Sequence, residues 1–313
     1  MVLEAFEGRA VLVTGASGFL GSYLSRSLVA AGARVHAVSR IARVSEVPGL
    51  RWRQCEMEDM EAVRALLAET KPEVIYHLSG MVNGAPELRL VLPTFHSLLG
   101  STVNLLTAAT EQGCRRVVLV GSLEEPAGSA LDVSPTSPYG AAKLGVAAYG
   151  RMFHRLFGTP VVILRTYMTY GPGQPEWKVI PAVIGALLRG EVPEMSSGTR
   201  RLDWIYIDDV TDGFLRSGYA PSLEGTTLEI GSGSTASIRE VVGLLARLLD
   251  CREEPRFGAL PDRPSRVVRA ADSAEARARL GWEPTVSLEE GLRRTVAWYQ
   301  QRVLNNKKGG SEP

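Results

Sequence analysis

Tyr139 and Lys143 are separated by four positions in the segment Ser-Pro-Tyr-Gly-Ala-Ala-Lys. If the segment is helical, this spacing places a phenol and an ammonium on one face of the helix. A nearby cation favours the phenolate, so the pair could exchange a proton with a carbinol or a ketone near neutral pH. The same spacing is common for a packed tyrosine beside a solvated lysine, so the motif needs support from elsewhere in the chain.

The composition is that of a globular chain without a strong charge bias. Of 313 residues, 45% are hydrophobic, which is enough to bury a large core, and the formal net charge is +1. Positive residues are scattered, so there is no electrostatic case for a nucleic-acid or membrane partner. Cys55, Cys114 and Cys251 lack the spacing of a metal site or a disulfide framework. We therefore expect a soluble, cytoplasmic protein, without a signal sequence or an apolar run long enough to span a bilayer.

Strand-like and helix-like segments alternate in the first half of the chain. Short runs rich in Val, Ile and Leu, each followed by small or polar residues, cover Ala10–Thr14, Arg34–Val38, Glu73–Leu78, Arg116–Val120 and Pro160–Leu164. Helical patterns between them cover Phe19–Ala31, Asp59–Glu69, Thr94–Glu111 and Tyr139–Phe157. This alternation predicts an α/β fold with a doubly wound parallel sheet and helices on both faces.

The first strand leads directly into a glycine-rich turn and then into a helix. The turn reads Thr-Gly-Ala-Ser-Gly-Phe-Leu-Gly, an order that sets a pyrophosphate on the helix N-terminus. Gly15 permits the tight turn, Gly18 lets the backbone approach a phosphate, and Gly21 lets the helix pack closely on the strand. We therefore predict that a dinucleotide contacts Gly15, Ser17, Gly18, Phe19, Leu20 and Gly21.

The end of the second strand bears on which dinucleotide binds. An acidic residue there would accept hydrogen bonds from the adenosine ribose of NAD, but this chain has Ser39 and Arg40, with Arg43 close behind. A cation at this place suits a 2′-phosphate, so the sequence favours NADP. NAD remains the alternative, because an arginine can also stack on adenine or be solvated.

Further landmarks extend the pattern to the C-terminal part of the chain. They are His77-Leu-Ser-Gly80, Arg165 through Tyr170-Gly-Pro-Gly-Gln174, Asp203-Trp-Ile-Tyr-Ile-Asp-Asp209 and Leu280-Gly-Trp-x-Pro284. With these motifs, the chain resembles the extended short-chain dehydrogenase/reductase family over nearly its whole length. It is most similar to nucleotide-sugar epimerases, dehydratases and ketoreductases.

The resemblance implies a Rossmann-like sheet with a smaller C-terminal substrate-binding lobe, and it implies roles for particular residues. Tyr139 would be the acid/base, and Lys143 would bond the nicotinamide ribose and lower the pKa of Tyr139. Further residues implied at the cofactor are Glu56, Met57, Leu78, Ser79 and Gly80. The resemblance also implies a homodimer built from the helices Thr94–Glu111 and Tyr139–Phe157.

The segment before the tyrosine departs from the family pattern. Relatives have a Ser or Thr hydroxyl where this chain has Leu123, so Ser122 is the nearest substitute. Glu124 and Glu125 occupy places where dehydratases resembling this chain carry an acid, and a carboxylate there could remove and return a proton during loss of water. A solvated loop is the alternative interpretation of these glutamates. The candidate catalytic residues are therefore Tyr139, Lys143, Ser122 and Glu125.

The substrate side also departs from the family pattern. The asparagine that usually meets the sugar nucleotide is Met168, and the arginine usually found before Asp-Trp is Leu202. Because arginine binds phosphate bidentately, Arg263 and then Arg201 are candidates for the diphosphate, with a surface position as the alternative for each. The candidate substrate-binding residues are Glu124, Met168, Gln174, Lys178, Arg201 and Arg263. The four histidines lack carboxylate companions at metal spacing, so no metal is expected.

The pattern becomes irregular after residue 170. Helical segments are expected at Ile180–Leu188, Ile238–Leu249 and Leu288–Arg302, and strands at Trp204–Ile207 and Thr227–Ile230. We expect residues 1–170 to form the NAD(P)-binding domain, with 203–230 returning to it. Residues 171–202 and 231–304 would form the substrate-binding lobe, and 305–313 a disordered tail.

Together these features predict an NAD(P)-dependent oxidoreductase that acts on a nucleotide-diphosphate sugar. Arg40 favours NADPH, and hence a 4-ketoreductase of an NDP-4-keto-6-deoxyhexose, by analogy with reductive biosynthesis. If the cofactor is retained in each cycle, the reaction would instead be 4-epimerisation or 4,6-dehydration. A non-catalytic cofactor sensor or scaffold is the alternative from another class, suggested by Leu123, Met168 and Leu202.

Overall fold

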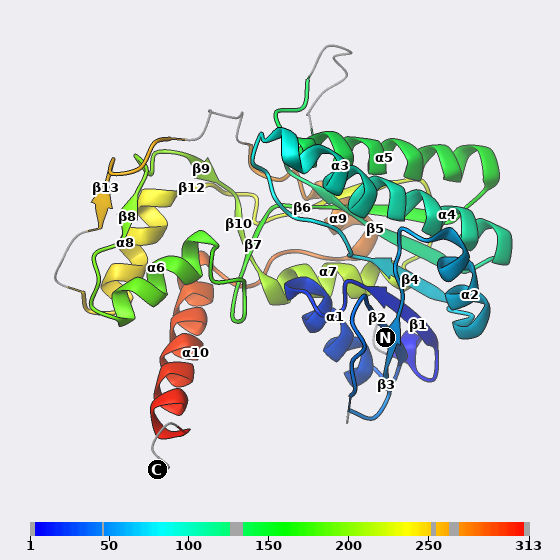
Figure 1. The fold of residues 1–313 in the computed structure, drawn as a ribbon, viewed down its shortest axis with the longest axis horizontal. Helices are drawn as coiled ribbons and strands as arrows, with labels where there is room; N and C mark the ends of the chain where they lie inside the picture. Colours follow the sequence, from blue (N-terminus) through cyan, green and yellow to red (C-terminus); the bar gives the residue numbers. More distant parts are fainter. Residues whose placement is uncertain (1–3, 46, 126–133, 252–254, 263–268, 310–313) are drawn as a thin grey trace. The chain divides into compact units, whose positions relative to one another are not determined.

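The computed structural model describes residues 4–45, 47–125, 134–251, 255–262 and 269–309 (Figure 1). The chain forms two compact units. Unit 1 comprises Met1–Thr166, Thr211–Ile230 and Ala274–Trp282, and unit 2 comprises Tyr167–Val210, Gly231–Ser273 and Glu283–Pro313. The first boundary therefore falls after Thr166 rather than after Tyr170, and residues 203–210 belong to unit 2.

Unit 1 is built on a seven-stranded parallel sheet with the order β11-β6-β5-β4-β1-β2-β3. The strands are β1 (Ala10–Thr14), β2 (Arg34–Ser39), β3 (Leu50–Gln54), β4 (Val74–His77), β5 (Arg116–Ser122), β6 (Val161–Thr166) and β11 (Thr227–Ile230). The predicted doubly wound parallel sheet is confirmed. Of these strands, β3 was not predicted from the sequence. It lies at the edge of the sheet and none of its residues is fully buried. The strand therefore lacks the apolar run by which the other strands were recognised.

Helices cover both faces of this sheet (Figure 1). They are α1 (Phe19–Ala30), α2 (Met60–Thr70), α4 (Ser101–Gln112), α5 (Pro138–Phe157), α7 (Ile207–Tyr219), which begins in unit 2, and the short α9 (Ala274–Leu280), with 3-10 turns at Glu4–Phe6 and Leu88–Leu90. Buried apolar side chains of α2, α4 and α5 pack on β1, β4, β5 and β6 to form the main core. Each of these helices has side chains that are nearly or fully buried, and α5 contacts both β5 and β6.

The helical segment Leu88–Gln112 contains the short α3 (Val91–Thr94) and a π-helical turn, η3 (Phe95–Gly100), before α4. Length and composition alone would allow this segment to cross a membrane. Within unit 1, however, Leu105, Leu106 and Ala109 of α4 are buried in the main core. This packing accounts for the apolar character of the segment's second half.

In its described residues, unit 2 contains small two-stranded sheets and helices that pack together. The strand pairs are β7 (Met168–Tyr170) with β10 (Trp204–Tyr206), β8 (Glu194–Met195) with β13 (Arg256–Phe257), and β9 (Arg201–Leu202) with β12 (Ala236–Ser237). The helices α6 (Val179–Leu188), α8 (Ile238–Leu248) and α10 (Leu288–Gly309) contact one another.

Two expectations for this part of the chain differ from the structure. β10 does not join the large sheet with the rest of 203–230, because the free edge of β6 is already paired with β11, and β10 pairs with β7 instead. The helix α10 continues to Gly309, whereas a disordered tail was expected at 305–313, of which residues 310–313 lie outside the described part of the chain. Once a helix is packed, each further residue adds one backbone hydrogen bond, so polar residues can extend it beyond the packed part.

Candidate active site

The start of α5 places Tyr139 in the interior of unit 1. Ser137 caps the helix by accepting a hydrogen bond from the Gly140 amide at 3.1 Å, and Pro138 occupies the first helical position. The Tyr139 side chain is buried and packs with Leu98 and Ala142. Because Leu98 lies on the π-helical turn η3, that turn helps to set the orientation of the phenol.

The environment of Tyr139 keeps the phenol protonated. Burial raises its pKa to about 12, a hydrogen bond with the Ser122 hydroxyl lowers it, and the charges of Glu124 and Glu125 raise it further. The Ser122 side chain, at the end of β5, is also buried. The structure therefore places Ser122 beside the phenol, where the sequence suggested that it substitutes for the usual hydroxyl. Leu123 is held by its backbone amide, which donates to the Thr166 carbonyl at 3.0 Å.

Lys143 follows Tyr139 on α5, and its ammonium is also buried. Nζ donates to the Val120 carbonyl at 2.7 Å and lies 5.9 Å from the centre of the Tyr139 ring. Burial lowers the pKa of Lys143 to about 8, and the charge of Glu125 opposes that fall. The contact that lowers the pKa of Tyr139 here comes from Ser122, and the expectation that Lys143 also lowers it stays a prediction.

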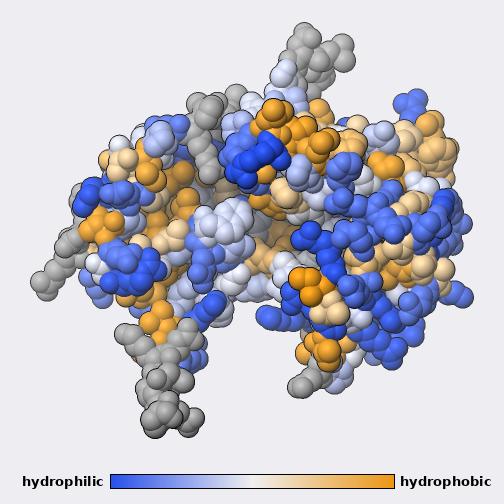
Figure 2. Space-filling model, in the orientation of Figure 1, coloured by the Kyte–Doolittle hydropathy of each residue, from blue (hydrophilic) through white to orange (hydrophobic). Residues whose placement is uncertain are grey.

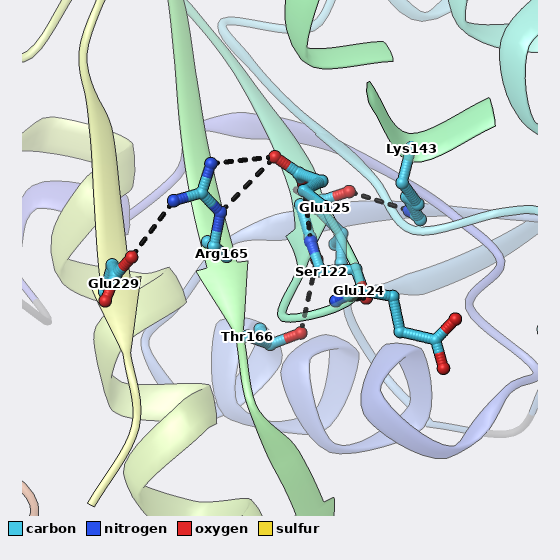
Figure 3. A network of polar contacts seen from close by, with 9 residues as sticks. Ser122, Glu124, Glu125, Lys143, Arg165, Thr166 and Glu229 are labelled. Atoms are coloured by element: carbon cyan, nitrogen blue, oxygen red, sulfur yellow. Dashed lines mark hydrogen bonds and ion pairs between the residues drawn. The ribbon is translucent and has the colours of Figure 1, made fainter. Parts of the chain in front are cut away.

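Glu125 was a candidate proton-transfer group, but both oxygens of its carboxylate accept hydrogen bonds from other residues of the protein (Figure 3). Oε1 accepts the Ser122 amide at 2.6 Å, and Oε2 accepts from Arg165 Nη2 at 2.9 Å and Nε at 3.3 Å. The side chain is only 1% exposed. A base must reach the proton that it removes. With both oxygens occupied in the interior, Glu125 does not fit the catalytic role expected from the sequence.

Glu124, its neighbour, is half-buried and has a different environment. Its Oε2 accepts from the Ser137 hydroxyl at 3.3 Å, next to the start of α5. The charge of Glu124 adds to the larger effect of burial in raising the pKa of Tyr139. Of the two adjacent glutamates, Glu124 is therefore the one whose surroundings fit the substrate-side role that the sequence suggested.

The glycine turn has the form that a dinucleotide pyrophosphate requires. Gly15 has a φ of +65°, and a Cβ at this position would lie 2.8 Å from the Ser79 amide nitrogen. No side chain among the described residues caps α1, whose N-cap is Gly18 and whose first turn has no acidic residue. Backbone amides and the positive end of the helix dipole are therefore left for an anion.

Hydrogen bonds join the glycine turn to the end of β4. The Thr14 hydroxyl accepts the amides of Leu78 at 3.1 Å and Ser79 at 3.2 Å and contacts His77 Nδ1 at 2.9 Å. Burial, with the Lys143 charge, lowers the pKa of His77 to about 3, so this buried ring is neutral. The structure thus brings together the glycine turn and Leu78, Ser79 and Gly80, two of the predicted groups of cofactor residues.

The end of β2 carries cationic side chains. Arg40 is exposed, and the Arg43 guanidinium lies 5.4 Å from the Trp52 ring, with Nε 3.4 Å from the Ser39 hydroxyl. The strand ends on Ser39 rather than on a carboxylate. Glu56 and Met57 follow β3, with Glu56 exposed and Met57 buried. The Ser39 hydroxyl and the guanidinium groups of Arg40 and Arg43 therefore lie at the expected adenosine end of the site, with the Glu56 carboxylate after the neighbouring strand.

The remaining substrate-side candidates lie in unit 2, except Arg263, which is outside the described residues. Met168 is in β7, and Lys178 Nζ lies 4.3 Å from the exposed Trp177 ring. Gln174 is buried and donates to the Thr169 carbonyl at 2.8 Å, so its side-chain amide stabilises the loop in which it lies. Arg201 donates to the Thr235 carbonyl at 2.6 Å and pairs with Glu240 at 3.1 Å. Arg201 therefore has partners within unit 2, and the diphosphate role expected for it stays a prediction.

Sequence reasoning assigned no role to Arg165 or Glu229. In the sheet register, Gly121 of β5, Arg165 of β6 and Glu229 of β11 are neighbours. Arg165 Nη1 donates to Glu229 at 3.0 Å, so the guanidinium lies between two carboxylates (Figure 3). A charged residue inside an apolar strand pattern was the available signal, but its partners depend on which strands are adjacent.

Comparisons with known proteins agree with this geometry. A model of the NAD dependent epimerase/dehydratase family matches residues 11–231. The chain is 32% identical to UDP-glucose 4-epimerase of Mycolicibacterium smegmatis, covering 93% of this chain and 98% of the relative. It is 29% identical to dTDP-glucose 4,6-dehydratase of Streptomyces griseus, covering 93% and 94%.

A solved structure extends the likeness to three dimensions. The UDP-glucose 4-epimerase of Thermotoga maritima, determined with UDP-glucose, superimposes with a TM-score of 0.84 at 27% sequence identity. The match covers 94% of this chain and 99% of the epimerase. Both units of the present chain therefore have counterparts in that enzyme.

Proposed function

Because the chain belongs to the NAD-dependent epimerase/dehydratase family, as its motifs led us to expect, we propose that it reduces the 4-ketone of an NDP-4-keto-6-deoxyhexose. The observation that carries this proposal is the state of Tyr139. The phenol is buried, hydrogen-bonded to Ser122 and protonated at neutral pH. A protonated donor suits reduction, because the ketone oxygen takes up a proton as the carbon becomes a carbinol.

In this reaction, different residues of unit 1 bind the cofactor, donate the proton and stabilise the phenolate. The glycine turn and the Leu78–Gly80 segment bind the dinucleotide, which supplies the hydride when it is bound. Tyr139 donates its hydroxyl proton to the substrate oxygen, and the Ser122 hydroxyl orients the phenol and stabilises the phenolate that forms. Lys143 contributes its positive charge next to the developing phenolate.

Dehydration is disfavoured by the position of Glu125. A 4,6-dehydratase needs a group that removes a proton beside the ketone. Glu125 cannot supply it while its carboxylate binds Arg165 and the Ser122 amide. Leu123 has no proton to exchange, and Glu124 is the remaining carboxylate of this segment.

NADP is the dinucleotide that we propose for the reductive reaction, although the family is NAD-dependent. Arg40 and Arg43 provide positive charge at the end of β2, and a 2′-phosphate would be bound there bidentately. NAD-binding sites of this fold favour an acidic residue at the same strand end, which is Ser39 here.

Epimerisation at C4 is the second candidate, and the relatives favour it. A 4-epimerase relative covers nearly the whole chain at 32% identity. The same Tyr139 would then take a proton from the carbinol in one half-reaction and return it in the other. The two reactions differ in whether the reduced cofactor is consumed.

An assay with the purified full chain separates these functions. We expect stoichiometric consumption of NADPH with an NDP-4-keto-6-deoxyhexose, followed by its absorbance, and a 4-hydroxy product identified by NMR. NADH is the comparison cofactor, and Arg40→Ala should reduce the preference for NADPH. Conversion of UDP-glucose to its C4 epimer without net cofactor consumption would support the epimerase instead. Cofactor binding without any turnover would contradict both and favour a sensor.

We also propose that the chain forms a homodimer through the face that carries α3. Leu88, Leu92 and Phe95 are 88%, 65% and 47% exposed, and Figure 2 shows apolar residues gathered over α3. An apolar patch of this kind marks a protein contact. We expect light scattering to give twice the chain mass for the wild type and the monomer mass for Leu92→Glu. Val44→Glu, which changes an exposed valine outside this face, should remain dimeric.

A further inference from the structure

The position of Glu125 depends on a small residue beneath it. A Cβ at Gly121 would lie 2.7 Å from Glu125 Oε1, so glycine leaves the space that the carboxylate fills. The Glu125 amide in turn donates to the Ser122 carbonyl at 3.0 Å. Residues 122–125 therefore form a tight turn in which the Glu125 side chain folds back and accepts a hydrogen bond from the Ser122 amide. This turn carries the hydroxyl that contacts Tyr139.

The charges around this turn balance one another. Glu125 and Glu229 are acidic, and Arg165 and Lys143 are basic, so four formal charges sum to zero in the interior. The Glu125 and Glu229 side chains are 1% and 12% exposed. An ion in such a place needs a partner, because removing it from water is costly. Arginine stays charged in proteins, so Lys143 is the basic group of the set that can lose its proton.

We propose that Glu125, held by Arg165, is a positioning residue that keeps the Ser122 hydroxyl beside Tyr139 and keeps Lys143 charged, and that it exchanges no proton with substrate. This inference builds on the proposed role of Tyr139 and Lys143 in proton transfer. It differs from the dehydratase assignment, in which a carboxylate at this place acts as a base.

Of the charged groups near Lys143, Glu125 is the one that opposes the effect of burial on its pKa. Tyr139 is neutral up to a pKa of about 12, and His77 on β4 is neutral above a pKa of about 3. The Val120 carbonyl accepts from Nζ whether or not the amine is charged. Glu124 and Glu125 both act on Tyr139, and Glu125 is the carboxylate that also raises the pKa of Lys143. Neutralising Glu125 should therefore release the proton of Lys143 at lower pH.

The titration of Lys143 can be measured directly, because the chain has five lysines: Lys71, Lys143, Lys178, Lys307 and Lys308. In the protein labelled with ¹³C at the lysine ε-carbon, Lys143→Arg identifies the signal of interest. We expect Lys143 to titrate near pH 8 in the wild type. In Glu125→Gln the midpoint should fall by roughly one pH unit. The basic limb of kcat/KM should move by the same amount, which a purely structural defect would not produce.

The matched control is Glu124→Gln, which neutralises the adjacent carboxylate. It should leave the Lys143 midpoint unchanged. If Glu125→Gln does not fold, Glu229→Gln removes the outer carboxylate of Arg165 and should give a smaller shift in the same direction. An unchanged Lys143 midpoint in the folded variant would overturn the proposal. Because the titration needs no substrate, a shift without turnover would contradict the proposed function and leave this inference standing.

Discussion

Replacing Tyr139 by Phe should reduce kcat by about 10²- to 10⁴-fold, the usual contribution of a general acid. The substitution removes the hydroxyl proton and the contact with Ser122 while keeping the ring that packs on Leu98 and Ala142. We therefore expect a folded protein that binds the dinucleotide with unchanged affinity. Steady-state kinetics and a cofactor titration would measure the two effects separately.

Tyr149→Phe is the matched control for this prediction. It removes the same hydroxyl from the same helix, at a side chain that is 41% exposed. Its kcat should equal that of the wild type. Full activity in Tyr139→Phe would show that another group moves the proton, and the function proposed above would then fail.

Gly21→Ala should destabilise unit 1 and weaken cofactor binding together. An added Cβ would overlap the Gly15 carbonyl oxygen, which belongs to the backbone and cannot rotate away. Either α1 moves off β1 or the glycine turn opens, and the phosphate-binding amides move in both cases. We expect the free energy of unfolding to fall by about 3 kcal/mol, measured by denaturant titration.

Gly243→Ala is the matched control, because the same substitution should have the opposite effect on stability at this position. Gly243 lies inside α8, and a Cβ there would meet only the end of the flexible Arg247 side chain at 3.9 Å. Alanine should stabilise this helix by up to about 1 kcal/mol and leave cofactor affinity unchanged. Equal stability of Gly21→Ala and the wild type would show that α1 is not tightly packed on the turn.

Much of the site could be predicted because it depends on spacing within one segment. The glycine turn needs a strand, three glycines and a helix in order, and all of these lie in residues 10–30. The i,i+4 pair on α5 is equally local. The strands β1, β4, β5 and β6 were visible as apolar runs because both faces of their sheet are covered.

The roles of adjacent or distant polar residues could not be predicted in the same way. Glu124 and Glu125 are identical in type, yet one lies beside the start of α5 and the other is enclosed by Arg165. Arg201 was a candidate for the diphosphate, and in the structure it bonds to Thr235 and Glu240. In each case the partner comes from a remote segment, so local spacing carries no information about it.

The sequence by itself determined the parallel sheet, the dinucleotide turn and the Tyr139–Lys143 pair, because short-range steric and periodic constraints specify them. Only the tertiary structure placed Ser122 beside Tyr139 and paired Glu125 with Arg165. Strand order and register bring β5, β6 and β11 together, and the chemistry of a buried charge is set by the partners that this arrangement supplies.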